Sequence, residues 1–310
     1  MSQLRCVTIP RLILSCGAIA YCLIWMTTLP SFRLTRPRQI IRLTISTTTE
    51  TSKMIRATFS AETNTIDVHL PKSWAELDDT ELRLVYQAMA TVSEEALPYT
   101  LFRILAGVRQ SREGIVPGKW KLSIRTNAGL KYVYVTPTQI AEQAKCLDFV
   151  YTAGLFPVRI AKIGKGAAVD AQLRGVAFGD WLRVENLYQG YLSSQNVESL
   201  VAATGILYPG FRGKTLTQAE VLNVLNWLVQ VKALFARTFS RFFRPVVTTE
   251  ATEAPNMLET MNNQIRALTG GDVTKEEVIL ATGCWRALTE LDYKAREAEE
   301  LNAAMAKNKN

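Results

Sequence analysis

The amino-acid sequence predicts a mainly α-helical protein with a small β element, of the α+β class: a helical core with a β-hairpin and a C-terminal helical pair. Apolar residues recur at helical spacing through most of the chain beyond residue 70. A period of two is confined to residues 54–70 and 120–136. With 310 residues, 48% of them hydrophobic, the chain has enough apolar material for a core.

The elements of the first half follow from local signals. Residues 54–70 alternate as a short strand pair, and His69, the only histidine, is out of phase with the apolar positions and is expected to face solvent. Ser73 and Glu76 form a capping box for a helix to about Ala90, and a second helix at 98–108 is expected to lie antiparallel to it.

A hairpin and a further helix follow. KLSIRT and KYVYVT flank the turn residues 127–129, as in a β-hairpin. Thr136, Pro137 and Gln139 then combine a cap, a first-turn proline and a box partner, which predicts a helix start.

The second half is predicted to be helical and rich in aromatic residues. Residues 216–239 form the most regular helix, which we expect in the core. A polar linker at 246–256 precedes two helices, at 257–268 and 275–305, and Thr274 with Glu277 forms a box for the second. The predicted organisation is an N-terminal segment 1–53, a body 54–245, the linker 246–256 and C-terminal helices 257–310.

Residues 1–53 differ from the rest of the chain. Residues 12–29 are apolar and about long enough to cross a membrane as a helix, and the excess of Lys and Arg after them would keep the body in the cytoplasm, at the inner membrane. The competing interpretation is a start placed too early, since Met54 opens a compact new beginning. A membrane partner is expected only through residues 12–29.

The net charge of +8 is unevenly distributed. Residues 1–53 contain six Arg and one Lys against one Glu, which is +6, and only +2 remains for residues 54–310. The near-neutral body argues against nucleic acid as a partner. Cys146 and Cys284 lie in apolar-periodic stretches, where buried thiols in a reducing compartment are expected.

The sequence offers no set of residues for catalysis. A lone histidine cannot supply both a base and its partners, and adjacent Asp78 and Asp79 point about 100° apart on a helix. IGKGAAVD at 163–170 lacks phosphate-loop spacing. We therefore predict a protein that is not an enzyme, with no catalytic, cofactor-binding or metal-binding residues.

Two groups of residues are candidates for contact with partners. Aromatic residues at helical spacing could line a groove for another chain, or form a buried helix face. A run that interleaves basic and aromatic residues could stack on single-stranded nucleic acid or meet an acidic partner, or could be a core-facing helix end with solvated arginines. The first group is Trp181, Tyr188 and Tyr191; the second is Arg237, Phe239, Arg241, Phe242, Phe243 and Arg244.

Several segments resemble a protein family of Bacteroidota phages and prophages. They are PKSWAELDDTELRLVYQAMA (71–90), ENLYQGYL (185–192), LYPGFRG (207–213), NWLVQVKALFARTFSRFFRP (226–245) and the stretch from QIRALTGGDV to EAEELN (264–302). The resemblance begins near Met54, which favours the early-start interpretation of residues 1–53. No functional residue is assigned in that family, so none is transferred.

The resemblance implies a role in tail or virion assembly. The expected function is that of a non-enzymatic phage structural or assembly protein, similar to a tail-assembly chaperone, which contacts other phage structural or assembly proteins in the host cytoplasm or in the virion. Two alternatives remain: a single-pass membrane-anchored protein with a cytoplasmic helical domain, and a nucleic-acid-binding accessory protein.

Overall fold

The computed structural model describes residues 57–60, 65–111, 116–126, 129–244 and 257–308. Within these residues it contains nine α-helices, α2 to α10, and three small antiparallel sheets, which confirms the mainly α class with a small β element. The described residues up to Gly154 form one compact unit, unit 1, and those from Leu155 onward form unit 2. The N-terminal segment 1–53 and the linker 246–256 lie outside the described residues. No helix of the described part is long and apolar enough to cross a membrane.

Unit 1 contains three α-helices. They are α2 (Asp79–Thr91), α3 (Leu97–Leu105) and α4 (Pro137–Ala144), and α4 continues into a 3-10 helix, Lys145–Tyr151. The predicted capping box of Thr136 and Gln139 starts α4, with Gln139 N donating to Thr136 Oγ1 at 3.2 Å.

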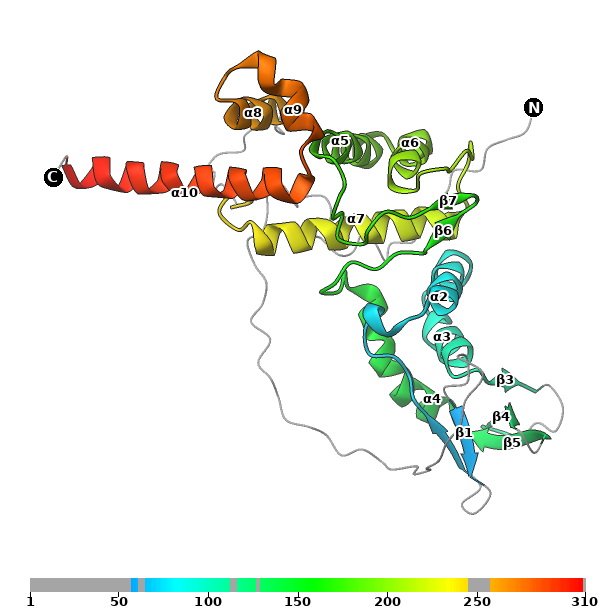
Figure 1. Ribbon diagram of the computed structural model, residues 1–310. Helices are drawn as coiled ribbons and strands as arrows, with labels where there is room; N and C mark the ends of the chain where they lie inside the picture. The colour runs from blue at the N-terminus through cyan, green and yellow to red at the C-terminus, as the bar shows by residue number, and fades with distance from the viewer. Residues whose placement is uncertain (1–56, 61–64, 112–115, 127–128, 245–256, 309–310) are drawn as a thin grey trace. The chain divides into compact units, whose positions relative to one another are not determined.

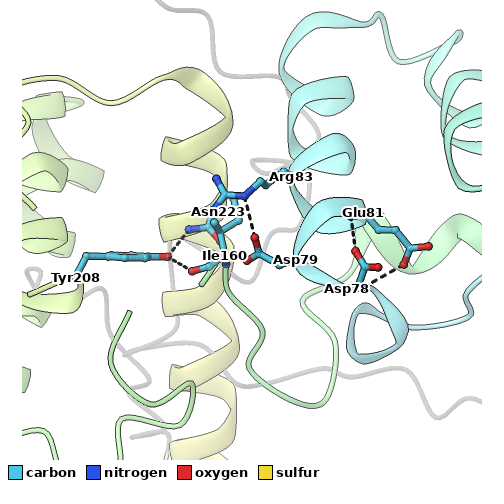
Figure 2. A network of polar contacts seen from close by, with 7 residues as sticks. All are labelled: Asp78, Asp79, Glu81, Arg83, Ile160, Tyr208 and Asn223. Carbon is cyan, nitrogen blue, oxygen red and sulfur yellow. Dashed lines mark hydrogen bonds and ion pairs between the residues drawn. The ribbon is translucent and has the colours of Figure 1, made fainter. Parts of the chain in front are cut away.

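The predicted start of the first helix at Ser73 is wrong. Trp74 to Glu76 form only a 3-10 turn, and the helix begins after Asp78, whose carboxylate accepts from Glu81 N at 2.8 Å (Figure 2). The early turn directs Trp74 inward: its side chain is 2% exposed and its Nε1 donates to the carbonyl oxygen of Thr152 at 2.8 Å. The burial of this indole against distant residues therefore outweighs the local capping signal of Ser73 and Glu76.

The strands of unit 1 form two sheets. β1 (Ala57–Ser60) pairs with β2 (Thr65–Val68), and β3 (Arg109–Gln110), β4 (Trp120–Thr126) and β5 (Gly129–Val135) form a three-stranded sheet (Figure 1). The predicted hairpin β4–β5 is confirmed, and β3 was not anticipated. Just after β2, His69 is exposed, as expected.

The described residues of unit 2 form six α-helices and one short strand pair. Its elements are β6 (Lys162–Ile163), β7 (Gly166–Ala167), α5 (Phe178–Ser194), α6 (Val197–Leu207), α7 (Gln218–Thr238), α8 (Met257–Thr269), α9 (Glu276–Ala281) and α10 (Cys284–Asn308) (Figure 1). Helix α7 is a core helix, as predicted, and Thr217 with Glu220 forms its capping box.

Three side chains of α7 bind the backbone of an irregular segment. Asn223, Trp227 and Gln230 lie at i, i+4 and i+7, which places them on one face of the helix. Asn223 Oδ1 accepts from Ile160 N at 2.9 Å, Gln230 Oε1 accepts from Val158 N at 2.7 Å, and Trp227 Nε1 donates to the carbonyl oxygen of Ala171 at 2.7 Å. On either side of the β6–β7 pair, Val158, Ile160 and Ala171 therefore satisfy their backbone hydrogen bonding through side chains of α7.

Tyr208 completes this arrangement. Its hydroxyl accepts from Asn223 Nδ2 at 2.9 Å and donates to the carbonyl oxygen of Ile160 at 2.9 Å (Figure 2). The ring packs edge-on against Trp227 at 5.7 Å between centroids. Asn223 and Tyr208 are both fully buried. The hydrogen bonds between them and Ile160 therefore replace the hydrogen bonds to water that these groups lose on folding.

The predicted single helix from 275 to 305 is wrong. Asp272, not Thr274, provides a cap, and it caps a 3-10 turn, Val273–Lys275, by accepting from Thr274 N at 3.0 Å. Helix α9 follows this turn, and α9 and α10 are separated at Thr282 and Gly283. At this break Phe178 N donates to the carbonyl oxygen of Thr282 at 2.7 Å, so the interrupted helix pairs with the chain just before α5. The break exchanges helical hydrogen bonds for tertiary ones, which helix propensity cannot predict.

Asn223→Ala is expected to lower the free energy of unfolding of unit 2 by about 1–3 kcal/mol, because it leaves the buried amide of Ile160 without its acceptor. Urea denaturation of the full chain, followed by tryptophan fluorescence, measures the change. Asn186→Ala, at an exposed position on α5, is the matched control and should change stability by less than about 0.5 kcal/mol. Equal effects of the two substitutions would contradict the assigned role of Asn223.

Candidate interaction site

A buried ion pair joins α5 to α7. Lys232 Nζ donates to Glu185 Oε1, and the two side chains are 8% and 10% exposed. Gln189 Nε2 donates to the same oxygen at 2.8 Å, and the Lys232 ammonium also lies 5.2 Å from the centroid of the Tyr188 ring. Glu185 Oε2 is buried and has no hydrogen-bond partner among the described residues. A buried carboxylate is tolerated only with such a counter-charge, so the two residues depend on each other.

A small cavity adjoins the pair. Its volume is about 30 Å³, enough for a water molecule, and most of its lining is apolar. Besides Glu185 and Lys232, the lining comes from α5, α7, α8, α10 and the turn after α7; it includes Trp181, Phe235, Phe242, Phe243, Met257, Met261 and Leu288. The cavity therefore places one charged pair among aromatic and sulfur-containing side chains, at the junction of four helices.

The first predicted group of contact residues lies in the core. Trp181, Tyr188 and Tyr191 are 4%, 2% and 3% exposed, and Trp181 packs edge-on against Phe235 with centroids 5.1 Å apart. Burial raises the pKa of the Tyr191 hydroxyl. Of the two interpretations that the sequence left open for this group, the geometry is that of the buried helix face, although Trp181 also lines the cavity.

The aromatic residues of the second group turn toward α10. Phe239 is 4% exposed and packs against Trp285 with centroids 5.4 Å apart, while the half-buried Phe242 and Phe243 line the cavity. The backbone amides of Arg241 and Phe242 donate to Asp292 Oδ1 at 2.9 and 3.0 Å. This run therefore ends α7 by docking it on α10.

The cations of that run lie at the surface, and two of them make contacts within the chain. Arg244 Nη1 lies 2.8 Å from Glu299 Oε1 on α10, and Arg237 donates to the carbonyl oxygen of Leu155. Arg241 is exposed. The structure thus separates the rings of this run, which face inward, from its charges, which face outward.

A larger apolar groove lies between α5, α8 and α9. Its volume is about 450 Å³. Its apolar lining includes Leu182, Leu258, Met261, Ile265 and Leu280, with Asp180, Arg183, Asn186 and Asn262 as polar members. Gly179 lets α9 approach α5 closely, because a Cβ at that position would lie 3.2 Å from Cβ of Leu280.

Helices α8 and α9 bury little of their own surface. Within α8 only Thr269 is buried, and α9 has no buried residue. Leu258, Val273 and Val278 are 65%, 79% and 68% exposed. Three large hydrophobic residues on or between these two helices are therefore exposed, and one of them, Leu258, lines the apolar groove.

The sequence interpretation missed Glu185 and Lys232, although a signal for them exists. Glu185 lies between Trp181 and Tyr188 on one helix face, and Lys232 lies between Leu228 and Phe235 on another. A charge in the middle of an apolar stripe on each of two helices, with opposite signs, is the pattern that a buried ion pair produces.

Reactive groups in unit 2 are protected. Burial raises the pKa of the Cys284 thiol to about 12, and its Sγ lies 3.9 Å from the carbonyl oxygen of Leu173. At neutral pH this thiol is protonated and a poor nucleophile. Across the described residues, no group of three or more His, Cys, Asp or Glu side chains is placed to hold a metal ion.

Comparisons with protein families, with curated proteins and with solved structures find no match to this chain. The class of protein is therefore defined by its own geometry: a two-unit, mainly helical protein whose second unit carries a buried ion pair, a small cavity and an open apolar groove.

Lys232→Met is expected to lower the free energy of unfolding by about 3–5 kcal/mol, because Glu185 would remain buried without its counter-charge. The double variant Glu185→Leu/Lys232→Met removes both charges and should recover most of that loss. Urea denaturation of the two variants and the wild type measures the difference. If the double variant were as unstable as Lys232→Met, the loss would come from packing and not from the unpaired charge.

The two described cysteines should differ in reactivity at pH 8. Cys284, with its pKa of about 12, should react with iodoacetamide only after denaturation. Burial also raises the pKa of the half-buried Cys146, but less completely, so this thiol should react in the folded protein, more slowly than in urea. Peptide mapping by mass spectrometry assigns the label to each position. Labelling of Cys284 in the folded state at the rate seen in urea would contradict its burial in solution.

Proposed function

We propose that this protein is a non-enzymatic binding protein that acts through protein–protein contacts made by α5, α8 and α9. The observation that supports this function best is the apolar groove, whose lining includes the exposed Leu258, on helices that also expose Val273 and Val278 nearby in the sequence. Isolated exposed hydrophobic residues are common on surfaces, but an exposed leucine that lines an open apolar groove is typical of an interface.

The groove favours an amphipathic helix as the element that binds there. Its floor is apolar, and its polar members include Asp180 and Arg183, whose charges lie 3.4 Å apart at the surface. An apolar helix face fits such a floor, and the polar edge of that helix would meet these charged side chains. Because α8 and α9 have few buried residues, they can shift and so adjust the groove to its partner.

The resemblance of the sequence to phage and prophage proteins supports a particular setting for these contacts. In that setting the partner is another structural or assembly protein, and the chain acts in the host cytoplasm or in the virion, similar to a tail-assembly chaperone. In this setting, the groove of unit 2 would bind a helix of that phage protein.

Co-expression with the proteins encoded by neighbouring genes tests this function. The wild-type chain should co-purify with one of them, and Leu258→Asp should weaken the complex by at least about tenfold in Kd, because it places a carboxylate on the apolar groove. Leu301→Asp, at a similarly exposed leucine of α10, is the matched control and should leave Kd unchanged. A wild-type chain that stays monomeric beside all of these proteins would overturn the proposal.

A further inference from the structure

The outward face of the β3–β4–β5 sheet has an unusual composition. Residues that are paired across an antiparallel sheet share a face, so the register places seven side chains together. They are Arg109 from β3, Lys121, Ser123 and Arg125 from β4, and Leu130, Tyr132 and Tyr134 from β5. This set, called here the basic aromatic face, contains three cations, two tyrosines and no carboxylate; Lys121 is half-buried and Ser123 is buried within the set.

The opposite face of the sheet is part of the core of unit 1. Leu122, Ile124 and Val133 are 2%, 1% and 6% exposed. On the basic aromatic face, in contrast, Leu130, Tyr132 and Tyr134 are 53%, 43% and 45% exposed. One face of the sheet therefore packs on the core of unit 1. The strands are held in place by that packing, and the two tyrosine rings on the other face are exposed.

The aromatic rings and the cations of this face are interleaved. Lys121 lies directly opposite Tyr134, and its Nζ is 4.4 Å from the centroid of the diagonally placed Tyr132 ring. The two tyrosines are two residues apart on one strand, a spacing of about 7 Å. Arg109 and Arg125 are exposed on the neighbouring strands.

The charge of unit 1 is segregated along the chain. Residues 101–140 contain a single acid, Glu113, against seven cations, which are Arg103, Arg109, Arg112, Lys119, Lys121, Arg125 and Lys131. Acids predominate in the rest of the unit, so the whole is near neutral. The near-neutral net charge of the unit therefore averages over a segment that is locally basic and suited to an anionic partner.

We propose that the basic aromatic face binds single-stranded DNA, with phosphates on Arg109, Lys121 and Arg125 and bases stacked on Tyr132 and Tyr134. Proteins that bind single strands combine a cationic surface with exposed aromatic rings, because phosphates need charge and unpaired bases need a flat apolar partner. Phosphate contacts and base stacking are common to single-stranded DNA and RNA, and the comparison of dT15 with rU15 below decides between them. The proposal concerns unit 1 and is independent of the function proposed for unit 2.

The experiment measures binding of the full chain to a fluorescent dT15 oligonucleotide by anisotropy over a range of salt concentrations. Residues 1–53 are themselves strongly basic, so the decisive readout is the difference between variants and not the affinity alone. Three phosphate contacts contribute about −2 to the slope of log K against log salt, and Lys121→Gln should make the slope shallower by about 0.7.

The tyrosines provide the second readout. Tyr132→Ala should weaken binding by about 5- to 150-fold with the salt slope unchanged, and Tyr132→Phe should bind as the wild type, because stacking needs the ring and not the hydroxyl. Tyr293→Ala on α10 and Arg241→Gln after α7 are matched exposed controls in unit 2 and should leave binding unchanged. Circular dichroism confirms that each variant is folded.

Several outcomes would overturn the proposal. One is an unchanged affinity of Tyr132→Ala together with an unchanged salt slope of Lys121→Gln. Another is a loss of affinity in Arg241→Gln instead, which would place the site on the run after α7. Binding that depends on this face but is tighter for anionic phosphatidylserine vesicles or for polyglutamate than for dT15 would assign the face to a membrane or to an acidic protein. Tighter binding of rU15 would contradict the choice of DNA.

Discussion

The capture of an irregular backbone segment by α7 is the interaction on which the rest of unit 2 depends. Asn223, Trp227 and Gln230 occupy one face of a core helix and bind the backbone of residues 158–171. Without these contacts the segment would bury unpaired amides, each at a cost of about 1–3 kcal/mol. The chain that follows this segment pairs with the break between α9 and α10 through residues 176–178, at the start of α5, so the position of the segment constrains where these helices lie.

The ion pair of Glu185 and Lys232 is a second internal constraint, with a different physical role. Replacing a buried pair by apolar residues is often neutral or stabilising, so its value is not a gain in stability. A lysine and a glutamate that must meet fix the rotation of α5 and α7 about their axes, since any other rotation would leave a charge unpaired in an apolar interior. The cavity lies next to this ion pair, and so do Phe242 and Phe243, which follow the end of α7.

The two units present surfaces of different chemistry. In unit 2 the lining of the groove is mainly apolar, which suits burial against another protein. In unit 1 the exposed sheet face combines cations with phenol rings, which suits a polyanion with stackable bases. The net charge of residues 54–310 is only +2, so the overall composition indicates neither surface. Both surfaces become apparent only when the residues are assigned to the faces of the structure.

Several features could be predicted from the sequence because they depend on neighbours in the chain. The helical period of α7, the Thr136 capping box and the β4–β5 hairpin are local patterns, and the structure confirms all three. The start of α2 at Asp78, the break between α9 and α10 and the pairing of Glu185 with Lys232 were decided by the tertiary structure. Each of these requires a partner far away in the sequence, respectively Thr152, Phe178 and a second helix. Local propensities are worth a few tenths of a kcal/mol to about 1 kcal/mol, whereas burial of an indole, an amide or a charge is worth several, so the distant partner prevails.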